Sequence, residues 1–181
     1  MNIVLIGPRG VGKSSVARAL SRLCRWPVCS TDLLISYDNR GSSIPDIVHS
    51  ARDGWRHFRD LEYAVVVKVA RLERVIIDAG GGVVVDLDAE GAEIYSERKM
   101  KVLQACGFVV YLTGDPARLA ARVALDPNRP ALSAHHSEEA VMRRRDPFYR
   151  RAAHLVIDTT LTPRADLASI IWQQRPTGDL V

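Results

Sequence analysis

The sequence predicts an α/β fold of three layers, in which helices cover both faces of a five-stranded parallel sheet. Short β-branched runs alternate with longer amphipathic stretches, which is typical of βαβ units. A glycine-rich segment also joins the first predicted strand to the first predicted helix. The chain has 181 residues, 47% apolar and 25% charged, and shows no repeat or linker. We therefore expect residues 1–181 to form a single domain with a sizeable core.

Five short apolar runs are the predicted strands, in the order Asn2–Ile6, Pro27–Cys29, Val75–Ile77, Phe108–Leu112 and Leu155–Ile157. Helical spacing of apolar residues, or a helix-start signal, predicts the helices between them. These are Lys13–Cys24, a helix starting at Ser43-Ile44-Pro45-Asp46, Arg52–Ala70, a helix opened by Asp115-Pro116 that fades by Asp126-Pro127, Glu138–Ala152 and Arg164–Gln173. Residues 126–137 are polar, contain proline and lack an apolar period, which predicts a mobile surface loop.

Composition and charge exclude several classes of protein. The longest apolar run, Ala105–Leu112, is too short to cross a bilayer, and the N-terminus lacks the pattern of a signal peptide. Cysteines at 24, 29 and 106 have no metal-ligand spacing, so we expect reduced thiols. The net charge is +4, and of 25 basic residues only four are lysine, so 21 are arginine. Arginine suits phosphate and carboxylate ligands, although a GC-rich genome produces the same bias.

The segment Gly7-Pro8-Arg9-Gly10-Val11-Gly12-Lys13-Ser14 matches the phosphate-binding pattern G-x-x-x-x-G-K-[ST]. Its glycines let successive backbone N–H groups point at phosphate oxygens, above the positive end of the following helix. Lys13 is expected to reach the β- and γ-phosphates, and the Ser14 hydroxyl to take one position on Mg²⁺. Gly10, Val11, Gly12 and Ser15 complete the predicted nucleotide-binding loop. The motif follows a predicted strand and opens a predicted helix, which is the context it requires.

Two aspartates and a triple glycine follow the second and third predicted strands. Asp32 comes after the second strand, Asp78 follows the third, and Gly80-Gly81-Gly82 comes next. Ligands of open parallel sheets gather beyond the carboxyl ends of the strands. An aspartate at the Asp78 position suits a water-mediated contact with Mg²⁺, and glycines let backbone approach a ligand. The structural alternative makes Asp32 a helix N-cap and the glycines a turn; for Asp32, both roles are compatible.

Taken together, these residues resemble the shikimate kinases, a P-loop family related to the nucleoside-monophosphate kinases. The resemblance runs from Asn2 to about Ile171. Beyond the P-loop and Asp32, it depends on four motifs that follow in the order of the family: Gly54-Trp55-Arg56-His57-Phe58-Arg59-Asp60-Leu61-Glu62, then Gly80-Gly81-Gly82, then Arg129-Pro130-Ala131-Leu132, then Arg145-Asp146-Pro147-Phe148-Tyr149. The resemblance implies a P-loop kinase fold with a substrate-binding insertion at about 32–62 and a mobile lid at about 125–137.

For the acceptor, the resemblance implies that Asp32 contacts the hydroxyl to be phosphorylated and accepts its proton. Arg59 and Arg145 would clamp the shikimate carboxylate, a task that suits the guanidinium fork. The backbone of Gly81, within the triple glycine, would face the substrate ring.

For the nucleotide, the resemblance implies that Arg129, in the lid segment, neutralises charge on the phosphates. Arg122 would stack on adenine, and Pro163 lies in the matching adenine loop. Catalysis would then depend on Lys13, Asp32 and Arg129, with Mg²⁺ as cofactor and ATP as co-substrate.

The chain departs from the family at the second strand. The family has Asp-x-Asp there, and this chain has Ser30-Thr31-Asp32. Asp78 stands where the family has a small residue, so we hypothesise that Asp78 replaces the lost carboxylate near Mg²⁺. Ser36 also replaces a common glutamate, and Ala131 a common leucine.

The sequence is therefore interpreted as an ATP-dependent kinase that phosphorylates the 3-hydroxyl of shikimate. Its expected partners are ATP, ADP and shikimate, without nucleic acid or membrane, and it is expected to act as a cytoplasmic monomer. Two alternatives remain open: a related kinase of a small molecule such as gluconate, and a non-catalytic nucleotide-binding regulator. The lost acid at Ser30 motivates the regulator, and the presence of Lys13, Asp32 and Arg129 opposes it.

Overall fold

The computed structural model describes residues 1–125 and 137–177. Its main sheet has five parallel strands, as the sequence predicts. Their order across the sheet is β2 (Val28–Ser30), β3 (Ile76–Asp78), β1 (Asn2–Ile6), β6 (Gly107–Thr113) and β7 (Leu155–Asp158). The order places the end of β1, where the phosphate-binding motif begins, between β3 and β6.

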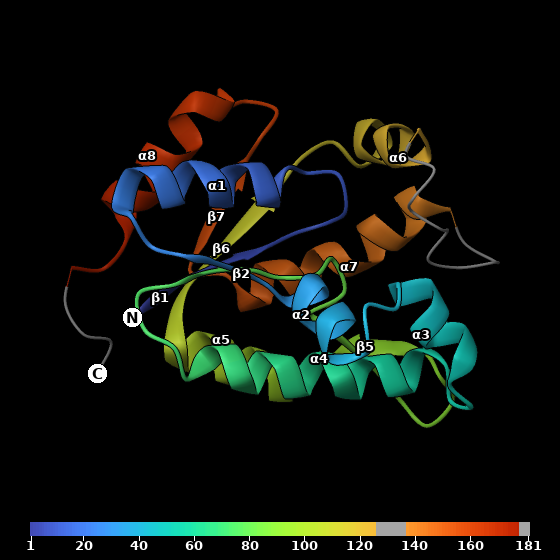
Figure 1. Cartoon of the computed structure of the whole chain (residues 1–181). Coiled ribbons are helices and arrows are strands. Elements are labelled where there is room, and N and C mark those ends of the chain that lie inside the picture. The colour runs from blue at the N-terminus through green and yellow to red at the C-terminus, as the bar shows by residue number, and fades with distance from the viewer. Residues whose placement is uncertain (126–136, 178–181) are drawn as a thin grey trace.

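Helices cover both faces of this sheet, which gives the three predicted layers (Figure 1). On one face lie α1 (Lys13–Cys24), α6 (Pro116–Ala124) and α8 (Arg164–Gln174), and on the other lie α2 (Thr31–Asp38), α3 (Ile44–Ser50), α4 (Trp55–Ala70) and α5 (Glu97–Cys106). The last helix, α7 (Glu138–Ala152), supplies buried residues to both cores.

Strand β1 shows how one apolar run builds both cores. All five of its residues are buried, and neighbouring side chains point to opposite faces of the sheet. Ile3 and Leu5 pack with α1 and α8, whereas Val4 and Ile6 pack with α4 and α5. An unbroken apolar run is therefore the expected pattern for a central parallel strand.

Several predicted boundaries are wrong by a few residues. Strand β2 starts at Val28 because Pro27 has no N–H for the ladder, although the Pro27 carbonyl still accepts from Ile76 N. Helix α4 starts at Trp55 rather than Arg52, because Gly54 adopts φ 46°, a non-helical conformation that turns the chain just before the helix. Strand β3 runs one residue further than predicted, so that Asp78 belongs to the ladder.

The sequence patterns did not predict α2, α5 or a two-stranded antiparallel hairpin of β4 (Val85–Leu87) and β5 (Glu93–Tyr95). Helix α2 exposes 72% of Leu33 and 80% of Tyr37 but buries Ile35, so its apolar residues do not share one face. Helix α5 buries Lys99 completely on its core side. In α5 this lysine shares the buried face with Met100 and Leu103, and in α2 the apolar residues are scattered, so neither segment was recognised as a helix.

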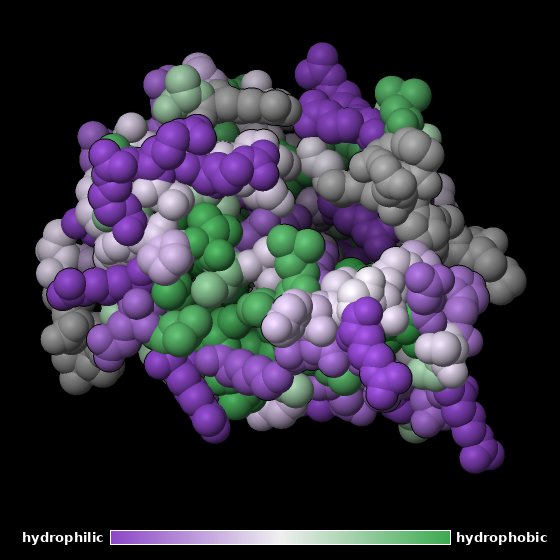
Figure 2. Space-filling view, in the orientation of Figure 1, coloured by the Kyte–Doolittle hydropathy of each residue, from purple (hydrophilic) through white to green (hydrophobic). Residues whose placement is uncertain are grey.

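Strand β2 forms one edge of the main sheet and has only three residues. Figure 2 shows apolar side chains gathered on this face of the molecule, and the exposed large apolar residues of the described chain include Leu23, Val28 and Leu33. A short edge strand offers few free backbone groups to another chain.

Within the described residues, no helix combines the length and apolarity needed to span a membrane.

Candidate functional site

The glycine-rich loop between β1 and α1 forms a tight turn around the ammonium group of Lys13. Gly12 caps α1 in a left-handed conformation, and a Cβ on Gly7 would lie 2.3 Å from the Leu112 carbonyl oxygen. Lys13 Nζ is buried and donates to the carbonyl oxygens of Gly7 (2.8 Å) and Pro8 (3.0 Å). The predicted residues Gly10, Val11, Gly12, Lys13, Ser14 and Ser15 thus lie in one loop and first helical turn.

Of the three other residues predicted to contact the nucleotide, the structure places two. Arg122, on α6, donates from Nη1 to the Gly10 carbonyl oxygen at 2.9 Å and so lies against the loop. Pro163 is the N-cap of α8 and follows β7. Arg129 lies outside the described residues.

Asp32 lies against the triple glycine at the carboxyl edge of the sheet. A Cβ on Gly80 would lie 2.3 Å from Asp32 Oδ1, so a larger residue would displace the carboxylate. The buried Thr31 hydroxyl accepts from Gly80 N at 2.9 Å and fixes this approach. Ser30, rather than Asp32, is the N-cap of α2, and its hydroxyl accepts from Leu33 N. The expectation that Asp32 caps a helix is therefore wrong, and its carboxylate points toward the glycines.

The surroundings of Asp32 make it a weaker acid than usual. Burial and, next, the Glu62 charge raise the pKa of the Asp32 carboxyl to about 6, with Asp78 acting in the same direction. Lys13 and Arg9 oppose the rise. A carboxylate whose pKa lies close to neutrality is suited to accept a proton and later release it.

Asp78 and Ser30 are Cα partners across β2 and β3. Asp78 is also the Cα partner of Leu5, two residues before the phosphate-binding loop begins. Asp78 therefore lies beside Ser30, the position at which the family has an aspartate and this chain does not. The Asp78 carboxylate is largely buried and close enough to Asp32 to affect its pKa.

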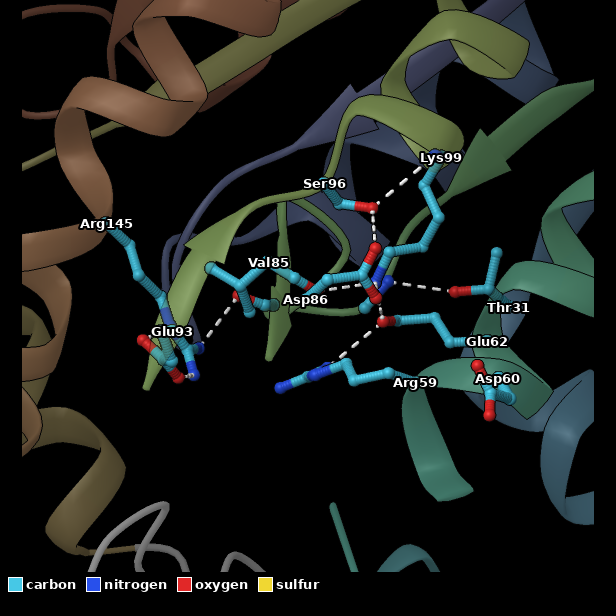
Figure 3. A network of polar contacts seen from close by, with 12 residues as sticks. Thr31, Arg59, Asp60, Glu62, Val85, Asp86, Glu93, Ser96, Lys99 and Arg145 are labelled. Atoms are coloured by element: carbon cyan, nitrogen blue, oxygen red, sulfur yellow. Dashed lines mark hydrogen bonds and ion pairs between the residues drawn. The ribbon is translucent and has the colours of Figure 1, made fainter. Parts of the chain in front are cut away.

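Arg59 is the first of two buried arginines beside the triple glycine. Its Nη1 donates to Glu62 Oε2 at 3.0 Å, and Lys99 Nζ donates to the same oxygen at 2.6 Å (Figure 3). A Cβ on Gly82 would lie 2.4 Å from Arg59 Nη1, so this glycine makes room for the guanidinium. Arg59 Nε is buried and has no hydrogen-bond partner among the described residues.

Glu62 holds its charge despite complete burial. Burial alone would raise the pKa of the Glu62 carboxyl, but the charges and hydrogen bonds of Lys99 and Arg59 outweigh this and lower it. The Arg59 guanidinium also lies 5.3 Å from the ring centroid of Trp55, a cation–π distance. Arg59 is thus fixed on two sides before any ligand arrives.

Arg145, on α7, is the second arginine and approaches the glycines from the other side. Its Nη1 donates to the Gly81 carbonyl oxygen at 3.2 Å, and the Tyr149 hydroxyl, one helical turn on, donates to the same oxygen. Its Nε donates to Glu93 Oε2 at 3.0 Å, and its Nη2 bonds to Glu93 Oε1 (Figure 3). Only 4% of the Arg145 side chain is exposed.

The three glycines therefore connect the predicted acceptor residues: Gly80 contacts Asp32, Gly81 contacts Arg145, and Gly82 contacts Arg59. The sequence motifs include Thr31 and Glu62 without a predicted role for either, and Glu93 and Lys99 were not predicted at all. Glu62 stands three residues after Arg59, a helical spacing that places the two on one face. Glu93 and Lys99 carry no such signal, because they come from elements that the patterns did not predict.

The arrangement combines an anion site with a carboxylate that accepts a proton. A loop of backbone N–H groups and Lys13 suits phosphates, and Asp32 lies within the electrostatic reach of Lys13. Two guanidinium groups beside the glycines suit a ligand carboxylate. These parts meet the needs of phosphoryl transfer to a small acid, namely positioning and charge neutralisation.

Comparisons with known proteins agree with this geometry. The family model described as shikimate kinase matches residues 9–175. A shikimate kinase of Leptospira biflexa is 40% identical over 171 residues, which cover 94% of this chain and 93% of that protein. The solved shikimate kinase of Acinetobacter baumannii, in complex with shikimate, has a TM-score of 0.79 and 31% identity and covers 95% of this chain and 90% of its own.

A gluconokinase of Sinorhizobium meliloti has a TM-score of 0.58 at 20% identity, covering 94% of this chain and 88% of its own. At that identity it shows a shared fold alone. The alternative of a gluconate kinase gains no further support from it. The family match over most of the chain, with the arginine pair around the triple glycine, establishes that this chain belongs to the shikimate kinase family, a family of phosphotransferases.

Proposed function

We propose that this chain transfers the γ-phosphoryl group of ATP to the 3-hydroxyl of shikimate. The observation that carries the proposal is the convergence on one glycine triplet of Asp32, which would hold the hydroxyl, with Arg59 and Arg145, which would hold the carboxylate. Arg59 contributes a buried donor, Nε, that has no partner among the described residues and suits a carboxylate oxygen. The Acinetobacter relative was solved with shikimate bound, which supports this choice of acceptor.

In the proposed reaction, the shikimate 3-oxygen attacks the γ-phosphorus, the bond from that phosphorus to the β–γ bridging oxygen breaks, and ADP leaves. The hydroxyl proton passes to Asp32, whose pKa of about 6 leaves it ionised at neutral pH. Lys13 and the backbone of its loop would neutralise charge on the phosphates. Arg129, which lies outside the described residues, is proposed to add a further positive charge, while Arg122 and Pro163 would hold the adenine.

We also propose that Mg²⁺, which the family generally uses with ATP, is held through Ser14 and Asp78. Among the described residues, no group of three or more His, Cys, Asp or Glu side chains could hold a metal alone. Such a sparse donor set fits Mg²⁺, which keeps several waters and shares phosphate oxygens with the protein. Bound Mg²⁺ would offset the charge on the phosphates, and Asp78 would orient a coordinating water.

The role of Asp78 is tested by Asp78→Asn, with Asp38→Asn, a half-exposed site on α2, as the control. We expect Asp78→Asn to raise the Mg²⁺ concentration that gives half-maximal turnover and to weaken the binding of Mn²⁺, measured by electron paramagnetic resonance with ADP present. The control should change neither quantity. Unchanged Mg²⁺ dependence in Asp78→Asn would remove Asp78 from the metal site.

The proposed reaction is tested by ADP release from Mg-ATP in the presence of shikimate, quinate or gluconate. We expect release that depends on shikimate and is much slower with the other two acids. Release with gluconate alone would point to the related kinase, and no release above background with any acceptor would point to a regulator.

A further inference from the structure

The β4–β5 hairpin lies outside the main sheet and is fastened to the helices around it. Arg56 of α4 donates from Nη1 to the Leu87 carbonyl oxygen at 3.2 Å. At the other end, the Ser96 hydroxyl donates to Asp86 Oδ2 at 2.6 Å, and Arg98 pairs with both Asp86 oxygens. Glu93 is the Cα partner of Leu87 at the start of β5. The hairpin therefore holds Glu93 at a fixed position facing α7.

Glu93 accepts hydrogen bonds from one edge of the Arg145 guanidinium and leaves the donors of another edge available to a ligand. A guanidinium carries five N–H donors, one on Nε and two on each terminal nitrogen. Glu93 takes Nε and one donor of Nη2, and Gly81 takes one donor of Nη1. One donor on each terminal nitrogen remains beyond these contacts. Two donors on adjacent nitrogens suffice for a bidentate contact with a second carboxylate.

The local charge also leaves Arg145 attractive to an anion. Glu93 Oε2 accepts from Arg144 Nη2 at 2.9 Å as well as from Arg145. The cluster of Arg144, Glu93 and Arg145 therefore keeps one net positive charge. Arg59, Glu62 and Lys99 show the same composition, one carboxylate between two cations, around the other arginine. Burial would raise the pKa of the Glu93 carboxyl, but its bonds to Arg145 and Arg144 lower it to about 2.

We propose that Glu93 is a positioning residue of the acceptor site, which holds the Nε and Nη2 donors of Arg145 so that its remaining donors face the carboxylate of the substrate. This inference rests on the proposed function, because it assumes that Arg145 binds the shikimate carboxylate. Without Glu93, the long Arg145 side chain would lose its only described carboxylate partners and would regain rotamer freedom. The substrate would then have to order Arg145 on binding, which lowers affinity.

The test is calorimetric binding of shikimate and of its methyl ester to the full chain and to Glu93→Gln. The ester keeps the ring and hydroxyls but cannot form the same charged contact with the arginines. In the unaltered chain we expect the acid to bind more tightly than the ester. In Glu93→Gln we expect the dissociation constant of the acid to rise about tenfold, the loss typical of one charge-assisted hydrogen bond. That of the ester and that of ATP should stay nearly constant.

Glu97→Gln is the matched control, because Glu97 is an exposed acid near the end of the hairpin that pairs with Arg151 rather than with the clamp. It should leave all three constants unchanged. If Glu93→Gln fails to fold, Glu93→Asp provides the test, since it keeps the charge but shortens the side chain. It should weaken the binding of shikimate and leave the binding of the ester and of ATP nearly unchanged.

Two results would overturn the inference. Tighter binding of the acid to Glu93→Gln would make Glu93 a competitor of the substrate, and an unchanged preference for acid over ester would give it no role in the clamp. Failure of the proposed function is a separate result, because the unaltered chain would then bind neither ligand or would bind both equally.

Discussion

The two arginines of the acceptor site are held by similar clusters in different surroundings. Arg59, Glu62 and Lys99 have side-chain exposures of 5%, 1% and 0%, so the whole first cluster belongs to the core. In the second cluster, Arg145 is equally buried, but Glu93 is 13% and Arg144 40% exposed. We therefore expect substitutions in the first cluster to affect folding as well as the proposed substrate binding, whereas the second cluster should tolerate substitution with the fold kept.

This difference predicts unequal losses of stability when the second cation of each cluster, Lys99 or Arg144, is removed. Lys99→Met leaves Glu62 buried with Arg59 as its one remaining partner in the cluster, and breaking a buried pair typically costs about 3–5 kcal/mol. Arg144→Ala removes a partly exposed cation, and the free energy of unfolding should fall by less than about 1 kcal/mol. Urea unfolding measures both.

The matched control for Lys99→Met is Lys101→Met, an exposed lysine on the same helix, which should leave stability nearly unchanged. A loss of stability in Lys99→Met no larger than in Arg144→Ala would contradict the distinction between the clusters.

The two clusters should also differ in their effect on the pKa of the Asp32 carboxyl. The Glu62 charge is the second cause, after burial, that raises the pKa of Asp32 to about 6. A carbon-detected NMR titration of the metal-free protein should give this value in the unaltered chain, a lower one in Glu62→Gln and the same one in Glu93→Gln. An equal response of Asp32 to both substitutions would show that the two clusters are not electrostatically distinct.

The raised pKa of Asp32 has a defined consequence for stability. The folded protein binds this proton more tightly than the unfolded chain, so the Asp32 contribution to stability falls as the pH rises from 3.8 to about 6. Turnover should change in the opposite sense and rise over the upper part of this range, since the proposed base must be ionised.

The sheet and the nucleotide loop could be predicted because their signals are local in the sequence. The five strands are short apolar runs, and the G-x-x-x-x-G-K-[ST] pattern specifies its own turn between β1 and α1. The order of strands, helices α2 and α5 and the hairpin could not be predicted in this way. Each depends on contacts between residues far apart in the chain, such as Lys99 with Glu62.

The grouping of the candidate acceptor residues could be predicted in part for the same reason. Asp32, Arg59 and Arg145 stand in motifs of the resembling family, and the structure brings all three to the triple glycine. The residues that hold the arginines were missed where they come from other elements, as Glu93 does. A carboxylate that pairs with an arginine 52 positions away has no signature in a single sequence.

Calorimetry of Arg59→Ala and Arg145→Ala is the most decisive measurement of whether Arg59 and Arg145 together bind the carboxylate of the substrate. Each substitution removes charge-assisted hydrogen bonds, so we expect shikimate to bind at least about tenfold more weakly to either variant. ATP binding should stay close to that of the unaltered chain, which also verifies folding. Equal losses of affinity for shikimate and ATP, or unchanged affinity for shikimate, would show that the two arginines do not bind the substrate carboxylate.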